Sequence, residues 1–140
     1  MSLSAARTTP ARAGTTLSLK IAADTVIYEG ALVCRDANGR AVPGSVATTL
    51  RGVGRARATY DNSGGANDAL DVEVDLGIFR YGNSASTDAI ATADIGNTCY
   101  VVDDETVAKT NGTNTRSKAG VVHDVDDSGV WVHFDTAAPI

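Results

Sequence analysis

Residues 121–134 read VVHDVDDSGVWVHF, and this stretch decides the fold class. The turn-forming run Asp126–Gly129 separates two segments rich in valine and aromatic residues, which is the pattern of a β-hairpin. Similar short runs of Val, Ile, Thr and Tyr follow one another from Thr16 onward, and clusters of Gly, Asn, Asp or Pro interrupt them. The chain is therefore predicted to be all-β.

The last predicted strand has two different faces, because side chains alternate along a strand. Val130, Val132 and Phe134 share one face, and Trp131 and His133 share the other. We expect the valine and phenylalanine face to point into the core. Trp131 then lies at the rim of the core or in a contact between subunits, and it is our candidate subunit-interface residue.

Several segments have the composition of strands. They are Leu17–Ala22, Val26–Tyr28, Ala31–Arg35, Arg40–Val42, Thr49–Tyr60, Ala69–Tyr81, Thr98–Val102, Thr106–Ala108, Lys118–Val125 and Val130–Asp135. The run Asp36–Gly39 ends in Asn-Gly and predicts a tight hairpin between the third and fourth segments. Only residues 86–95 suggest helix, where Ser86 or Thr87 would begin a turn that Gly96 ends. We expect a compact β-barrel or β-sandwich with at most one short helical turn.

The longest two segments are predicted to pair through opposite charges. The acids Asp71, Glu73 and Asp75 alternate with apolar residues in one segment, and arginines alternate with small residues in the other. If residues 61–68 form the connecting loop, Arg57 lies opposite Glu73 and Arg55 lies opposite Asp75. These ion pairs would fix the register of the two strands.

The arginine-bearing segment also carries Gly52 and Gly54, which we place with its alanines on one face. Such small side chains leave room for another sheet, or for bulky rings such as Phe79 and Tyr81. We interpret the two glycines as packing devices rather than as a phosphate-binding loop.

The first twenty residues form a segment of their own, with basic residues and no acid before Asp24. We assign residues 1–16 to an extended N-terminal arm and residues 17–140 to a single β-domain. The arm is either a frayed terminus or a segment that becomes ordered on an acidic neighbour. The candidate contact residues are Leu3, Arg7, Arg12 and Lys20.

The composition narrows the function classes. The 140 residues include 12 basic and 17 acidic side chains, and the formal net charge of −5 argues against a primary nucleic-acid binder. No apolar run approaches the roughly 18 residues of a membrane span, and no signal peptide is recognisable, so we expect a soluble protein made in the cytosol. Aromatic residues are only 5%, which predicts a thin core of Ala and Val that partner contacts help to stabilise.

No catalytic, metal or cofactor site is predicted. The sequence contains no GxxxxGK[ST], GxGxxG or GxSxG motif. Cys34 and Cys99 are far apart and are expected to be buried free thiols. His123 and His133 lie on neighbouring predicted strands but point to opposite faces in the simplest register, so they do not form a metal site. We therefore expect a protein that is not an enzyme.

Four stretches, taken in order, resemble the small capsid cement, or head decoration, proteins of tailed bacteriophages. They are VIYEGALV (26–33), GVG (52–54), IGNTCYVVDD (95–104) and the closing AGVVHDV…GVWVHF hairpin (119–134). The resemblance covers about residues 17 to 135, and the order of the motifs and the overall length carry it.

This resemblance implies a β-tulip-like body, commonly a homotrimer, that binds the outer surface of an expanded capsid and bridges neighbouring subunits of the major capsid protein. The protein would be assembled in the host cytoplasm and located in the virion. The resemblance supplies no catalytic residue. The alternative is a β-rich receptor- or glycan-binding module of a tail or fibre, although few aromatic side chains are present to form a carbohydrate site.

Overall fold

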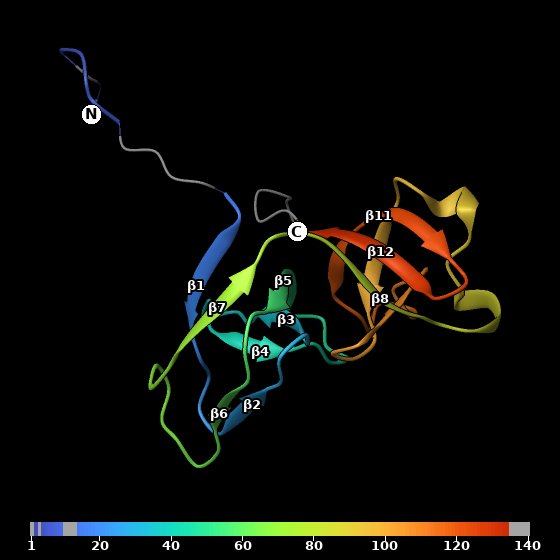
Figure 1. Ribbon diagram of the computed structural model, residues 1–140, viewed down its shortest axis with the longest axis horizontal. Coiled ribbons are helices and arrows are strands. Elements are labelled where there is room, and N and C mark those ends of the chain that lie inside the picture. Colours follow the sequence, from blue (N-terminus) through green and yellow to red (C-terminus); the bar gives the residue numbers. More distant parts are fainter. Residues whose placement is uncertain (1, 3, 10–13, 135–140) are drawn as a thin grey trace.

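The computed structural model describes residues 2, 4–9 and 14–134, and within them it confirms the all-β class (Figure 1). The first sheet contains, in spatial order, β1 (Thr16–Lys20), β7 (Asp71–Asp75), β5 (Arg51–Ala56), β3 (Leu32–Arg35) and β4 (Ala41–Pro43). A closed barrel contains β10 (Thr106–Ala108), β8 (Gly77–Asn83), β12 (Gly129–Phe134), β11 (Lys118–Asp126) and β9 (Thr98–Val101). Separately, β2 (Thr25–Ile27) pairs with β6 (Tyr60–Asn62).

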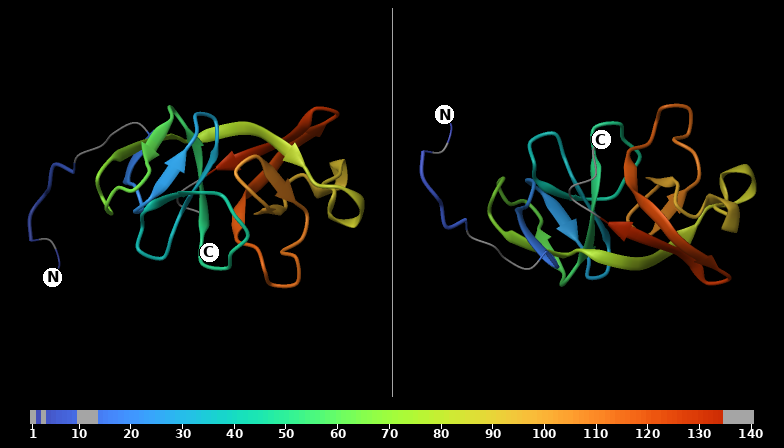
Figure 2. Two further views of the ribbon diagram at one scale, coloured as in Figure 1. Left: turned by 90° about the horizontal axis from the view of Figure 1, so that it is seen from below. Right: turned by 90° about the horizontal axis from the view of Figure 1, so that it is seen from above.

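The first sheet and the barrel lie side by side, and β8 leads from one to the other (Figure 2). The first sheet curls until Ile21, the residue after β1, forms a parallel bridge with Ala41 of β4. The amide of Ala22 also donates a hydrogen bond to the carbonyl of Ala41 at 3.2 Å. The sheet thereby surrounds a core of its own.

Each of the two bodies has its own buried cluster. The first core consists of Ile21, Ile27, Ala31, Val33, Ala41, Val53, Ala56, Val72 and Val74. The barrel core consists of Leu32, Cys34, Tyr81, Ile90, Cys99, Val101, Val107, Ala119, Val122, Val130, Val132 and Phe134. Strand β3 contributes to both, because Val33 lies in the first core while Leu32 and Cys34 lie in the barrel core. The two cores therefore share a strand.

The terminal hairpin has the predicted turn and the predicted faces. Strand β12 pairs with β11 from Val121–His133 to Asp126–Gly129, and Val130, Val132 and Phe134 are buried. The ring of Phe134 packs edge-on against Tyr81 at a centroid distance of 5.9 Å. The scarce aromatic side chains are thus used together in the barrel core.

The hairpin predicted at Asp36–Gly39 is also present between β3 and β4. One carboxylate oxygen of Asp36 accepts hydrogen bonds from the amides of Asn38 and Arg40, both at 2.9 Å. Gly39 has φ +82°, a left-handed conformation that glycine adopts without steric cost.

The two longest predicted strands are each interrupted. The segment 49–60 contains β5 and then the start of β6, and the segment 69–81 contains β7 and then β8. Gly77, with φ +141°, lies at the second break, where the chain leaves the first sheet for the barrel. Residues 61–68 are not a simple hairpin loop, because Tyr60–Asn62 pair with β2. The sequence pattern missed these breaks because each is made by pairing with a distant segment.

The prediction that Gly52, Gly54 and the alanines share one face of β5 is wrong, because the pairing of β5 with β3 contains a register shift. The ladder between β3 and β5 pairs Val33 with Gly54 and Cys34 with Gly52, which leaves Val53 as the extra residue. As a result Val53 and Ala56 both lie in the first core although their positions differ in parity. Gly52 does act as a packing device: a Cβ atom there would lie 2.2 Å from the carbonyl oxygen of Ala119 in β11.

The region predicted to contain one helical turn contains two. They are single 3-10 turns at Ser86–Asp88 and Thr92–Asp94. Neither Ser86 nor Thr87 forms a cap, because the turn begins after Ala85 and Ser86 itself has φ +58°. In the second turn, the carboxylate of Asp94 accepts a hydrogen bond from the amide of Ala91 at 2.8 Å.

The predicted register between β5 and β7 is confirmed, but one of the two predicted ion pairs has a different acid as its partner. Arg55 lies opposite Asp75, as predicted, and its guanidinium contacts that carboxylate at 3.2 Å. Arg57 also lies in the predicted register, because its amide donates a hydrogen bond to the carbonyl of Glu73 at 3.1 Å. Its guanidinium, however, binds the carboxylate of Asp75, at 2.8 Å, rather than that of Glu73. The β5 strand ends at Ala56, so the Arg57 side chain is free to reach the diagonal neighbour. Asp75 is therefore the shared acceptor of two arginines.

Asp75→Asn is expected to lower the urea midpoint more than Glu73→Gln at pH 7, because only Asp75 binds both arginines. Burial raises the pKa of Asp75, but the hydrogen bonds from Arg57 and Arg55 outweigh burial and hold it below 3.8. A depressed folded-state pKa gives stability that is present above the unfolded value and lost as pH falls through the folded one. The difference between wild type and Asp75→Asn should therefore shrink below pH 3.8. Equal losses from both substitutions at pH 7 would contradict this role.

Candidate interaction surface

The N-terminal segment is the first candidate surface. Residues 4–9 are exposed, belong to no strand, and lie away from the two sheets (Figure 1). Arg7 is among them, while Leu3 and Arg12 lie outside the described residues. Arg7 is thus placed where a partner surface can reach it.

Lys20 belongs to the first sheet rather than to the free segment. It is the last residue of β1, it lies opposite Asp71, and its ammonium contacts the Asp71 carboxylate at 2.6 Å. The hydrogen bond to Asp71 raises the pKa of Lys20. Strand β1 is an edge strand, and along Thr16–Lys20 no strand of the described chain pairs with its outer side. The arm therefore leads directly into an open sheet edge, which is a template for strand addition.

The outer face of the barrel is the second candidate surface, and we call it the Trp131 face. Two rows of opposed residues cross its three strands β8, β12 and β11. The rows are Ile78, His133 and Val121, and Arg80, Trp131 and Asp124. Ile78 and Val121 keep 39% and 37% of their surface exposed, although both are large and apolar. The face combines apolar, aromatic and charged side chains, which is the composition of many protein interfaces.

Trp131 is held in place on this face by two contacts. Its indole Nε1 donates a hydrogen bond to the carboxylate of Asp126 at 2.8 Å, and the guanidinium of Arg80 lies 5.7 Å from its ring centroid. The hydrogen bond from Trp131 is the main reason why the pKa of Asp126 lies below its usual value. The predicted interface residue is therefore half-buried in the monomer and pre-oriented, which lowers the entropy cost of a contact.

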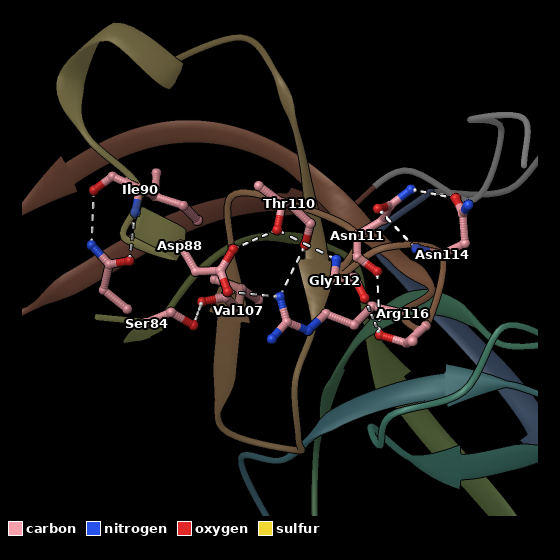
Figure 3. A network of polar contacts seen from close by, with 11 residues as sticks. Ser84, Asp88, Ile90, Val107, Thr110, Asn111, Gly112, Asn114 and Arg116 are labelled. Carbon is pink, nitrogen blue, oxygen red and sulfur yellow. Dashed lines mark hydrogen bonds and ion pairs between the residues drawn. The ribbon is translucent and has the colours of Figure 1, made fainter. Parts of the chain in front are cut away.

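Apart from these two surfaces, a polar cluster joins the loops that follow β8 and β10 (Figure 3). Asp88 accepts hydrogen bonds from the hydroxyl of Thr110 and, at 3.3 Å, from the guanidinium of Arg116. The same guanidinium donates to the carbonyl of Thr110 at 3.2 Å. These bonds tie two loops together, so we assign this cluster a structural role.

The residues considered for chemistry are not brought together. Cys34 and Cys99 are buried free thiols, as predicted, and burial raises the pKa of both to about 12. His123 and His133 are exposed, and His123 lies at a bulge between Val122 and Asp124. In the part of the chain that the structure describes, no three His, Cys, Asp or Glu side chains gather as a metal site would require. The described residues also form no helix long and apolar enough to cross a membrane.

Sequence reasoning identified Trp131 but missed the rest of its face. The signal was present, because Ile78 and Val121 are apolar residues at positions whose neighbours Phe79 and Val122 point inward. A pair of adjacent apolar residues in a half-buried strand places one of them outside. Comparisons of the chain with protein-family models, with curated proteins and with solved structures found no match.

Proposed function

We propose that this chain is a structural virion protein that decorates and stabilises the outer surface of an expanded bacteriophage capsid by bridging neighbouring major capsid protein subunits. One observation carries the proposal beyond the motif resemblance. The acid-free N-terminal segment is exposed at residues 4–9, includes Arg7, and leads into the open edge strand β1. Such a segment suits an extended contact with an acidic neighbour.

The charge distribution supports this contact mode. The whole chain has a net charge of −5, yet its first acid is Asp24, so the N-terminal segment is basic while the body is acidic. An acidic capsid surface would attract the segment and repel the body. The outer edge of β1 offers a place where a capsid strand can add to the sheet. We assign residues 4–9 and the edge of β1 to contacts with the same capsid neighbour.

Stabilisation of a shell needs no active site. A protein that binds only the expanded lattice stabilises it by RT ln(1 + [L]/Kd) per site, and many copies add their effects. The Trp131 face is the surface that we assign to the contact between subunits of a homotrimer. A trimer would present three N-terminal segments to neighbouring capsid subunits, so that each bound segment raises the effective concentration of the others.

The test is co-sedimentation with expanded and unexpanded empty capsids, assembled from the major capsid protein encoded in the same genome. We expect the full chain to sediment with expanded capsids alone. A chain lacking residues 1–13 should lose at least about 90% of this binding. Every subunit of the trimer then lacks its N-terminal segment, so the avidity of several linked contacts is lost. This truncation keeps Thr15, whose carbonyl accepts a hydrogen bond from the amide of Leu76 at 2.9 Å.

Two controls accompany the truncation. Its urea midpoint and its oligomeric state should match those of the full chain, since the removed residues precede β1 and both cores. Trp131→Ala should instead lower the oligomeric state and leave the contact of each monomer intact. Undiminished capsid binding by the truncated chain would contradict the proposed contact, and equal binding to both forms of capsid would contradict the function.

A further inference from the structure

A pocket lies at one end of the first sheet, between the turn after β3 and the segment before β5. Its volume is about 420 Å³. It is lined by Arg35, Asp36, Ala37, Asn38 and Gly39 on one side and by Thr48, Thr49, Leu50 and Arg51 on the other. Neither the N-terminal segment nor the Trp131 face contributes to it, so it is distinct from both proposed contact surfaces.

Arg35 and Arg51 face each other in this pocket. They are directly opposed in the ladder between β3 and β5, where two like charges destabilise a sheet. Neither guanidinium forms an ion pair within the described chain. The other arginines of the folded body behave differently: Arg40, Arg55, Arg57 and Arg116 bind carboxylates, and Arg80 stacks on Trp131.

Arg51 also has an unsatisfied donor. Its Nε atom is buried and has no hydrogen-bond partner among the residues that the structure describes. A buried N–H group without a partner destabilises the fold, because its hydrogen bond to water is lost and not replaced. This penalty is larger when the N–H belongs to a charged group. The opposed charges would be relieved by the arrival of an anion between the two guanidinium groups.

The two walls of the pocket are held in place before any ligand arrives. On one wall, Asp36 accepts from two backbone amides of its own turn. On the other wall, buried Ser117 donates to the carbonyl of Ala47 at 2.6 Å and accepts from the amide of Leu50 at 3.0 Å. These two bonds bracket Thr48 and Thr49, which line the pocket. A rigid pocket loses little entropy when it binds a ligand.

The net charge of the lining remains positive. Arg35 and Arg51 supply two positive charges and Asp36 one negative charge. Arg40 is next to the turn, but its guanidinium is bound to Asp68 at 2.9 Å. The planar fork of arginine matches the two oxygens of a carboxylate or phosphate group, and two such forks can hold one group from both sides.

We propose that this pocket binds a single oxyanion group of the carboxylate or phosphate type, held by Arg35 and Arg51. The group has two possible sources, free inorganic phosphate and the carboxylate of an acidic side chain on a partner protein. The inference does not depend on capsid decoration, because it rests on the pocket alone.

The test is an NMR titration of the full-length ¹⁵N-labelled chain at pH 7 and constant ionic strength, with chloride as the balancing anion. One arm uses inorganic phosphate and the other uses N-acetyl-aspartate amide. We expect saturable shifts of the amides that line the pocket, and the arm with the lower Kd identifies the source. Shifts that grow linearly with anion concentration in both arms would overturn the proposal.

Three variants make the result specific. Arg51→Gln should raise the Kd by about tenfold or more, since a charge-assisted hydrogen bond contributes at least that much. Arg51→Lys keeps the charge but loses the fork, so its Kd should lie between those of Arg51→Gln and wild type. Lys109→Gln changes the net charge equally at the end of barrel strand β10, and its Kd should stay within about twofold of wild type. Equal effects of Lys109→Gln and Arg51→Gln would overturn the site.

A second readout separates binding from a structural role. In chloride buffer without phosphate, Arg51→Gln should leave the melting temperature unchanged or raise it, because it removes a like-charge opposition and an orphan donor. A clear fall would show that Arg51 is retained for stability and would overturn the proposal. Arg35→Gln provides the same comparison from the opposite strand.

Discussion

Gly52→Ala is expected to disrupt the contact between the first sheet and the barrel, with a loss of about 3 kcal/mol or more in the free energy of unfolding. The added Cβ atom would lie 2.2 Å from the carbonyl oxygen of Ala119, 2.7 Å from its Cα and 2.8 Å from its carbonyl carbon. All three are backbone atoms of β11, so no side-chain rotation relieves the clash. The two bodies would have to move apart.

Two other glycines serve as matched controls for this prediction. At Gly14 an added Cβ would meet nothing within 4 Å, and Gly14→Ala should leave the urea midpoint unchanged. At Gly82, in strand β8, the nearest atom is the carbonyl oxygen of Glu105 at 3.1 Å, so Gly82→Ala should cause a small loss. Urea denaturation of the three variants gives the order. A Gly52→Ala protein as stable as Gly14→Ala would show that the sheet and barrel do not pack as described.

The parts of the fold that could be predicted are those determined by neighbouring residues. The turns at Asp36–Gly39 and Asp126–Gly129 were predicted because turn chemistry and strand alternation are both local signals. The pairing of β2 with β6 and the parallel pairing of β10 with β8 were not, because they join segments that are far apart in the sequence. The first long strand is interrupted where β6 pairs with β2, and the second is interrupted where β8 begins to pair with β12.

The same distinction explains which site residues were found. The outward position of Trp131 follows from alternation within one hairpin, and its bond to Asp126 lies within that hairpin as well. The opposition of Arg35 and Arg51 depends on the ladder between β3 and β5, whose register includes a bulge at Val53. No local pattern contains that register, so this pocket could be recognised only in the folded chain.

The position of β3 between the two cores leads to the second large prediction. Leu32→Ala should lower the free energy of unfolding by about 3 to 5 kcal/mol, the range for a fully buried leucine. Leu32 has no exposed surface and lies in the barrel core, although its strand belongs to the first sheet. Leu19→Ala is the matched control, because Leu19 is partly buried and packs against the first core alone. Its loss should be smaller.

Leu32→Ala should also keep a single unfolding transition. Trp131 is the only tryptophan, and its fluorescence reports on the barrel. The first core is followed by NMR through the methyl groups of Val53, Val72 and Val74, which are buried there. Because β3 carries side chains of both cores, loss of one core removes support from the other, and both probes should give the same urea midpoint. A fluorescence midpoint below that of the valine methyl signals would show that the barrel unfolds alone.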